Sequence, residues 1–318
     1  MSRKKTQSPL LIERILTGDK IAVSKAMSLI ENDDPEAHSI LDSIYDKTGK
    51  ALRLGITGPP GVGKSTLLCE LTLCIRKENE PVGIIAVDPS SYITGGALLG
   101  DRIRMQKIAT DDGTFIRSMA TRGNLGGLAR TTFEIADLLD ASGKKYILIE
   151  TVGVGQSEVD IVNTCDITAV VLSPESGDSI QAMKSGLMEA ADIVIINKKD
   201  RPGAEKLENE LRSTFELRTG TSVRVPILKT NALLSEGIPA VLSEVKGIFS
   251  DMRKNGSLAR RRRNNLKTKL CSLLQYNFLK AIKLSQKADR QMECLAEDVL
   301  CGKNTPYSDL DSLMVKFL

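Results

Sequence analysis

Apolar residues change their spacing along the chain, and these changes predict where helices and strands lie. In segments 11–16, 26–30 and 41–45 they recur three or four positions apart, which is the spacing of amphipathic helices. The sequence Asp33-Asp34-Pro35 is polar and contains a proline, so it predicts a break between two of these helices. We expect the N-terminal helices to pack on the domain that follows them.

A different pattern begins at Leu52, where short apolar runs alternate with segments of helical spacing. Runs that are apolar on both faces and separated by helices are typical of a parallel sheet covered on both sides. The predicted fold is therefore doubly wound α/β with a mostly parallel sheet, which binds ligands at the carboxyl ends of its strands. The predicted strands are Leu52–Thr57, Val82–Val87, Thr114–Ser118, Tyr146–Ile149, Ile167–Leu172, Ile193–Ile196 and Val225–Leu228.

After Val241 the strand pattern stops, and residues 257–318 again have helical spacing. Four consecutive arginines, Arg260 to Arg263, lie near the start of this part. A run of like charge is usually a solvated helix face. The alternative is a contact to a partner or to a second copy of the chain.

Composition narrows the possible functions. The net charge of +4 is too small to predict nucleic-acid or membrane binding by itself, and no apolar stretch approaches the roughly 18 residues of a membrane span. The N-terminus is basic without an apolar core, so it does not predict a secretory signal. The six cysteines form no C-x-x-C pair and there is a single histidine, which predicts reduced, mostly buried cysteines and a cytoplasmic protein.

The strongest motif follows the first predicted strand and precedes a predicted helix at 65–76. It is a complete G-x-x-x-x-G-K-[ST] phosphate-binding loop in the strand–loop–helix context that the motif requires. Its glycines allow backbone N–H groups to face phosphate, and the helix N-terminus adds positive potential. We expect Lys64 to reach the β- and γ-phosphates and the Ser65 hydroxyl to ligate magnesium. The loop residues are Gly58, Pro59, Pro60, Gly61, Val62, Gly63, Lys64, Ser65 and Thr66.

A second motif, N-K-x-D, follows the predicted strand at 193–196. The carboxylate of Asp200 can accept hydrogen bonds from both the ring N1–H and the exocyclic amine of guanine. Adenine offers no matching pair of donors, so a bound adenine would leave the carboxylate unpaired. The motif therefore predicts that Asn197, Lys198 and Asp200 bind guanine.

Acidic residues end two further strands. Glu150 can hold magnesium through water, and the N–H of Gly153 can meet the γ-phosphate. Gly155-Gln156 then forms a plausible switch. Asp88 and Asp101 could also line the phosphate site at the carboxyl edge of the sheet.

Together these motifs resemble the MeaB/ArgK family of P-loop GTPases over nearly the whole chain. Two long matching segments, 87–105 and 116–129, are not general GTPase motifs, so the resemblance is specific. It implies an N-terminal helical segment at 1–50, a P-loop GTPase domain at 51–250 and a C-terminal helical dimerisation arm at 251–318. The chain departs from the family at Asn124, where a histidine is expected, at Thr230-Asn231-Ala232, where a Ser-Ala pair is expected, and in an arm that lacks tryptophan.

The resemblance implies a GTPase that serves as a chaperone for an adenosylcobalamin-dependent acyl-CoA mutase, chiefly methylmalonyl-CoA mutase. Such proteins gate cofactor delivery and protect the mutase from inactivation, and they form homodimers through their C-terminal helices. The implied magnesium residues are Ser65, Asp88, Asp101 and Glu150. The implied residues of the last guanine segment are Asn231 and Ala232, and those of the partner-responsive switch are Asp178, Gln181 and Lys184.

The expected chemistry is magnesium-assisted attack of water on the γ-phosphate of GTP, giving GDP, with Lys64 neutralising the developing charge. Glu150, Gln156 and Asp101 are alternatives for the residue that orients the water. Three other functions remain open. The chain could be an ATPase or kinase linked to basic amino acid transport, which Asp200 disfavours. It could be a metal-insertion GTPase, which one histidine and no close cysteine pair disfavour. It could also be a scaffold that binds nucleotide without hydrolysing it.

Overall fold

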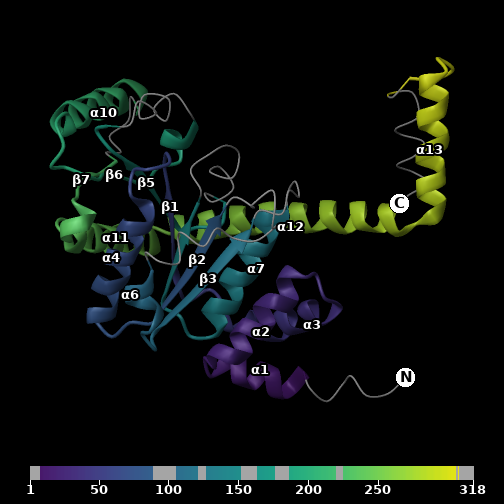
Figure 1. Cartoon of the computed structure of the whole chain (residues 1–318), viewed down its shortest axis with the longest axis horizontal. Coiled ribbons are helices and arrows are strands. Elements are labelled where there is room, and N and C mark those ends of the chain that lie inside the picture. Colours follow the sequence, from purple (N-terminus) through teal and green to yellow (C-terminus); the bar gives the residue numbers. More distant parts are fainter. Residues whose placement is uncertain are drawn as a thin grey trace. The chain divides into compact units, whose positions relative to one another are not determined.

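The computed structural model describes residues 8–88, 105–120, 127–151, 163–175, 186–219, 225–305 and 307. The chain divides into two compact units, residues 1–266 and residues 267–318 (Figure 1). The larger unit contains the sheet and the predicted phosphate loop. The predicted division into three parts stays a prediction.

The larger unit is built on a seven-stranded sheet with the strand order β3-β2-β4-β1-β5-β6-β7. Every pair of neighbouring strands in this order is parallel, which confirms the predicted doubly wound α/β fold. All positions of β5 and β6 are buried, as expected for strands covered on both faces. The strands are β1 (Leu52–Thr57), β2 (Val82–Asp88), β3 (Thr114–Ala120), β4 (Tyr146–Glu150), β5 (Ile167–Leu172), β6 (Ile193–Ile196) and β7 (Ile227–Lys229).

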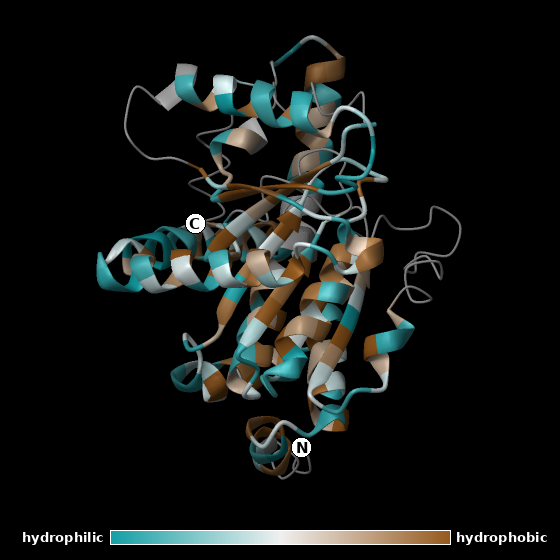
Figure 2. Ribbon diagram, turned by 90° about the vertical axis from the view of Figure 1, so that its left-hand side faces the viewer, coloured by the Kyte–Doolittle hydropathy of each residue, from teal (hydrophilic) through white to brown (hydrophobic). Residues whose placement is uncertain are grey.

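Helices cover both faces of the sheet (Figure 2), and alternate residues of a strand join different hydrophobic cores. In β2, Ile84 packs in the core with α4 (Lys64–Lys77), α6 (Gln106–Ala109) and α11 (Ile238–Lys254). Its neighbour Ile85 packs in the core on the other face. That second core contains α1 (Ser8–Leu16), α2 (Lys20–Glu31), α3 (Pro35–Ile44) and α7 (Gly127–Ala141), and α10 (Ala204–Thr219) completes a third core with β5 and β6.

The N-terminal helices pack on the domain as predicted, because their apolar faces join the same core as α7. Asp19 caps α2 by accepting from the N–H groups of Ile21 and Ala22 at 2.9 and 3.0 Å. Asp34 caps α3, and Pro35 occupies the first turn of that helix. The polar break at 33–35 is therefore a helix start rather than only an interruption. A 3-10 turn, η1 (Tyr45–Lys47), leads into β1.

The arginine run lies in the first turns of α12 (Ser257–Leu284), and two of its members contradict the prediction of a solvated face. Arg261 forms an ion pair with Asp192, and Arg262 forms one with Asp166. Both contacts lie within residues 1–266, so these two arginines are not a freely solvated face. The alternative, a contact to a partner or to a second copy of the chain, stays a prediction. Arg260 and Arg263 are exposed, as a solvated face requires.

The prediction of mostly buried cysteines is wrong for three of the six. Cys69 and Cys165 are buried, but Cys271, Cys294 and Cys301 are exposed. The exposed three lie on or next to α12 and α13 (Gln286–Leu300), in the smaller unit. None of the residues 267–305 whose burial is described is buried, so the described part of this unit offers no interior in which to place a cysteine. In the part of the chain that the structure describes, no helix is both long and apolar enough to cross a membrane.

Candidate nucleotide-binding site

The predicted phosphate loop lies at the carboxyl end of β1, where its glycines adopt backbone conformations that other residues rarely adopt. Gly58 has a φ of +141°, and a Cβ at this position would meet the carbonyl oxygen of Val171 at 2.0 Å. Gly63 has a φ of +94° and immediately precedes α4. As the N-cap residue, Gly63 has no side chain that could cap α4. The N–H groups at the N-terminus of α4 are therefore left to face the loop, as an anion site requires.

Lys64 begins α4 and curls back over the loop. It is 6% exposed, and its Nζ donates to the carbonyl oxygens of Gly58 and Pro59 at 2.7 and 2.9 Å. The loop therefore holds an ammonium group beside the N-terminus of the helix. Two sources of positive potential coincide there, which is the arrangement that binds polyphosphate.

Ser65 and Glu150 meet in the same site although 85 positions separate them in the sequence. The Ser65 hydroxyl donates to Oε1 of Glu150 at 2.7 Å, and both residues are buried. The contact arises because β1 and β4 are neighbours, with Ile56 in register with Glu150. A hydroxyl and a carboxylate are the hard oxygen ligands that magnesium prefers, so this pair fits a magnesium–nucleotide site.

Asn197 connects the phosphate loop with the two loops predicted to bind guanine. It follows β6 and is 3% exposed. Its Nδ2 donates to the carbonyl oxygen of Val62 at 2.9 Å, and its Oδ1 accepts from Thr230 Oγ1 at 3.1 Å and from the N–H of Ala232 at 3.0 Å. A buried amide with its polar atoms satisfied fixes the relative position of these three segments.

Asp200 is half-exposed at the edge of this cluster, and Asn231 holds its carboxylate. Asn231 Nδ2 donates to Asp200 Oδ1 at 2.8 Å, while Asn231 Oδ1 accepts from the N–H of Leu234. The Asn231 side chain therefore contacts the predicted guanine-binding carboxylate directly. Lys198, which lies between Asn197 and Asp200 in the sequence, adopts a left-handed backbone conformation with a φ of 59°. Its Nζ lies 3.5 Å from Oε2 of Glu175.

The contact between Asn231 and Asp200 leads to a prediction about binding. Asn231→Asp is nearly isosteric but replaces the amide donor with a second carboxylate, so we expect GDP affinity to fall about tenfold. Asn231→Ser keeps a donor and should lose less. The control is Asn255→Ala, which removes an exposed cap from Ser257 far along the chain. Calorimetric titration with GDP measures the effect, and unchanged affinity in Asn231→Asp would show that the contact does not orient Asp200.

The structure thus brings together Gly58–Thr66, Glu150, Asn197–Asp200 and Asn231-Ala232. The backbone of Asp88 ends β2, the strand next to β4, but its side chain is outside the described residues. Six other predicted site residues also lie outside them. These are Asp101, Gly153, Gln156, Asp178, Gln181 and Lys184.

Sequence reasoning named Thr230 only as part of the last guanine segment and gave it no role, although it is fully buried and bonds Asn197. The signal was present, because Thr230 follows β7 directly and the carboxyl ends of parallel strands meet at one edge. Its N–H donates to Ile196 and its carbonyl oxygen accepts from Lys199, so it joins the ends of β6 and β7.

A parallel sheet with a phosphate loop after β1, an acidic residue at the end of β4 and an N-K-x-D loop after β6 defines a P-loop nucleotide hydrolase. The comparisons with known proteins agree with this class. The family described as methylmalonyl-CoA mutase-associated GTPase MeaB matches residues 23–287. A putative GTPase of Pyrococcus horikoshii is 43% identical, over 97% of this chain and 98% of its own.

Two further proteins extend the match. The methylmalonic aciduria type A homolog of Mus musculus, a mitochondrial protein, is 31% identical over 95% of this chain and 78% of its own. A crystal structure of a protein described as an LAO/AO transport system kinase superposes with a TM-score of 0.72 and 25% identity, and covers 99% of both chains. The chain belongs to the MeaB family of P-loop GTPases.

Proposed function

We propose that this protein hydrolyses GTP with magnesium and acts as a chaperone for an adenosylcobalamin-dependent acyl-CoA mutase. In this role it gates cofactor loading and protects the mutase, with methylmalonyl-CoA mutase as the client. The observation that carries the GTPase part is the cluster of Asn197, Asp200 and Asn231 beside the phosphate loop. The mutase part is supported by the family description and by the name of the mouse relative.

Guanine selectivity follows from the chemistry of the cluster. Asn231 holds one oxygen of Asp200, and the carboxylate can accept from the N1–H and the amine of guanine. Adenine presents no such pair of donors, so its binding would leave a carboxylate unpaired. Because Asn197 also bonds Val62 of the phosphate loop, recognition of the base and of the phosphates is rigidly linked.

Hydrolysis would depend on positioning and charge rather than on a strong base. The Lys64 ammonium would exchange the carbonyl oxygens of Gly58 and Pro59 for phosphate oxygens and stabilise the charge that develops on them. Ser65 and Glu150 would hold magnesium, which supplies further charge neutralisation when bound. Glu150, Gln156 and Asp101 remain the candidates for orienting the water, and Asp88 and Asp101 the candidates for further magnesium contacts.

The chaperone role predicts a partner whose binding depends on the nucleotide. The protein would be loaded with GDP or with a non-hydrolysable GTP analogue, incubated with a lysate of its source cells, and the retained proteins identified by mass spectrometry. We expect an acyl-CoA mutase to be retained more strongly in one nucleotide state, because a switch acts by binding a partner differently in two states. An Asp200→Ala protein treated in the same way is the control for nucleotide dependence. Failure to retain any acyl-CoA mutase in either state would overturn this role while leaving the GTPase proposal intact.

The proposal includes a homodimer formed through the C-terminal helices. In residues 267–318, Leu270, Leu274 and Leu279 of α12 are 51%, 71% and 56% exposed. With Met292 and Leu300 on α13, they present apolar surface that a second copy could cover.

The dimer predicts a mass of twice 34.6 kDa by light scattering after gel filtration. A charge within this exposed apolar surface should disfavour association, so Leu274→Glu is expected to give the single-chain mass. Leu233→Glu is the matched control, because Leu233 is 83% exposed but lies on η3 (Ala232–Leu234) in the larger unit. A wild-type protein of single-chain mass, or a dimeric Leu274→Glu protein, would contradict the dimer.

A transport-linked ATPase or kinase is the second candidate, because the solved relative described above carries that description. The carboxylate of Asp200 beside Asn231 disfavours it, since both side chains would have to be rearranged to accept adenine. Turnover of ATP at the rate of GTP would favour this candidate.

A further inference from the structure

Asp192 lies where β5 and β6 begin, and Arg261 of α12 holds it there. Arg261 Nη1 and Nη2 donate to Asp192 Oδ2 and Oδ1 at 2.5 and 2.8 Å, which makes a bidentate pair. Nη1 also donates to the carbonyl oxygen of Asp166 at 2.6 Å. Asp192 Oδ2 in turn accepts from the N–H of Thr168 in β5 at 2.8 Å. One guanidinium therefore ties the start of α12 to the starts of two central strands.

The contact between Arg261 and Asp192 is largely shielded from solvent, so water could not fully replace it if it were lost. The side chains of Arg261 and Asp192 are 29% and 17% exposed. Burial lowers the pKa of Arg261, but the hydrogen bonds and charge of Asp192 outweigh burial and raise this pKa above its usual value. Without the guanidinium, Asp192 would be a partly buried carboxylate with no bidentate partner.

Strand β6 connects Asp192 directly with the guanine-binding loop. Its four residues, Ile193–Ile196, are all fully buried and pair with β5 on one side and β7 on the other. Asn197 is the next residue, so about 16 Å of extended chain separates Asp192 from the loop. A close-packed strand transmits a displacement of one end to the other instead of absorbing it. A shift at Asp192 would therefore reach Asn197 and Asp200.

We propose that Arg261 is a positioning residue for guanine recognition, which acts by fixing Asp192 and thereby the register of β6 and the loop Asn197–Asp200. This inference rests on the proposed guanine specificity. It couples the start of α12 to the nucleotide site within the unit formed by residues 1–266. Because coupling between sites is reciprocal, bound GDP should also stabilise the contact of Arg261 with Asp192.

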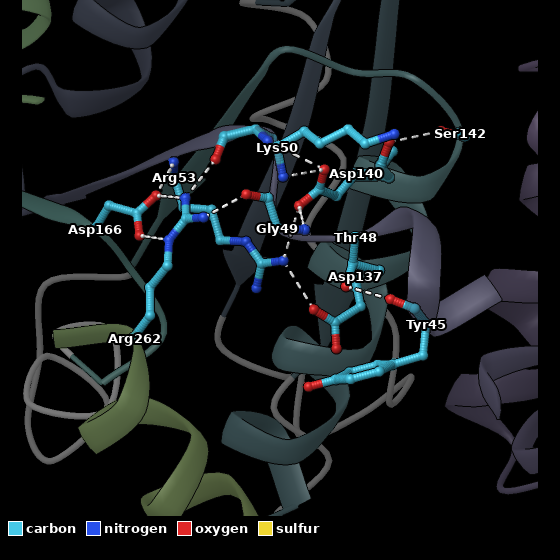
Figure 3. Close-up of polar contacts among 12 residues, drawn as sticks. Tyr45, Thr48, Gly49, Lys50, Arg53, Asp137, Asp140, Ser142, Asp166 and Arg262 are labelled. Carbon is cyan, nitrogen blue, oxygen red and sulfur yellow. Dashed lines mark hydrogen bonds and ion pairs between the residues drawn. The ribbon is translucent and has the colours of Figure 1, made fainter. Parts of the chain in front are cut away.

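The neighbouring arginine provides a matched control, because it makes equally strong contacts that avoid β6 (Figure 3). Arg262 Nε and Nη2 both donate to the carboxylate of Asp166 at 2.7 Å. Nη2 also donates to the carbonyl oxygen of Ala51 at 2.8 Å, and Nη1 donates to that of Gly49. These partners precede β5 and β1. Loss of Arg262 should thus lower stability without moving the loop that reads the base.

The test compares Arg261→Gln with Arg262→Gln in the full-length protein. Affinities for GDP, inosine diphosphate and ADP are measured by calorimetric titration with magnesium, and thermal unfolding is measured alongside. Inosine lacks the exocyclic amine of guanine, so the ratio of GDP to inosine diphosphate affinity reports how well Asp200 is placed. We expect both variants to unfold at lower temperature. Only Arg261→Gln should lower the ratio, by about fivefold or more.

The measured affinities separate the proposed guanine recognition from the proposed role of Arg261. If the wild-type protein shows no preference for GDP over ADP and inosine diphosphate, guanine recognition itself is overturned, and the inference with it. If the wild type prefers GDP and Arg261→Gln keeps the wild-type ratio, or if Arg262→Gln loses the ratio equally, Arg261 is only an anchor and the inference fails. Should Arg261→Gln not fold, Arg261→Lys, which keeps the charge but loses the bidentate geometry, is measured with the same expectation.

Discussion

Lys64→Ala is expected to lower GTP hydrolysis by about 100- to 1,000-fold, because one preorganised cationic donor beside the transferred phosphate is removed. The buried ammonium already lies between the loop and the N-terminus of α4, with donor contacts to Gly58 and Pro59. Little reorganisation is needed to place it against phosphate. The measurement is release of inorganic phosphate from GTP at saturating nucleotide.

Two controls separate chemistry from folding in this experiment. Lys77→Ala removes an exposed lysine from the other end of α4 and should retain the wild-type rate. The thermal unfolding of Lys64→Ala shows whether the loop still folds. If a folded Lys64→Ala protein hydrolysed GTP at the wild-type rate, the assignment of the phosphate loop as the catalytic site would be wrong.

The largest stability effect is expected from Arg53→Met. Arg53 begins β1, and its Nη2 donates to Asp137 at 2.8 Å and to Asp140 at 3.2 Å. These side chains are 13%, 10% and 0% exposed, respectively. Burial lowers the pKa of Arg53, but the charge and hydrogen bond of Asp137 outweigh this and raise it. Removal of one partner from such a buried, charged network typically costs about 3–5 kcal/mol.

Asp140 explains why this network matters to the fold. Its carboxylate accepts from the backbone N–H groups of Gly49, Lys50 and Ala51, which lead into β1, as well as from Arg53 (Figure 3). Disturbance of the network would therefore loosen the entry to the central strand. A loss of about 3 kcal/mol is a large fraction of a typical stability of about 5–15 kcal/mol.

The prediction is measured as the shift in urea midpoint and the change in unfolding free energy. Arg212→Met is the control, because Arg212 pairs with Glu208 four residues away on the more exposed surface of α10. Such a pair contributes about 0.5 kcal/mol or less. Equal midpoints for Arg53→Met and Arg212→Met would show that the buried network does not stabilise the protein.

The sequence was informative where a local pattern determines the structure. The seven apolar runs correspond to the seven strands, most clearly in β5 and β6, where every position is buried, whereas the edge strand β7 is only partly buried. The phosphate loop was predictable because Gly58 and Gly63 occupy conformations that few other residues tolerate. The placement of Ser65 and Glu150 in one site, though not their hydrogen bond, followed from the rule that neighbouring parallel strands end at one edge.

Contacts between distant residues were not predictable in the same way. Arg262 bonds Ala51 across 211 positions, and Arg261 bonds Asp192 across 69. The sequence around the arginine run therefore shows its charge but not the partners of its side chains. The role of Asn231 as the partner of Asp200 likewise needs the geometry of two loops. The exposed Cys271, Cys294 and Cys301 were misjudged because helical spacing does not tell whether a helix has a core to cover.

The preference of this protein for guanine nucleotides can be measured by comparing the rate of phosphate release from GTP with that from ATP. Both nucleotides would be supplied at equal concentration with magnesium, and Asp200→Ala would be measured beside the wild type. We expect GTP to be hydrolysed at least about 100-fold more efficiently than ATP and Asp200→Ala to lose most of this preference. Equal efficiencies for GTP and ATP in the wild-type protein would contradict it.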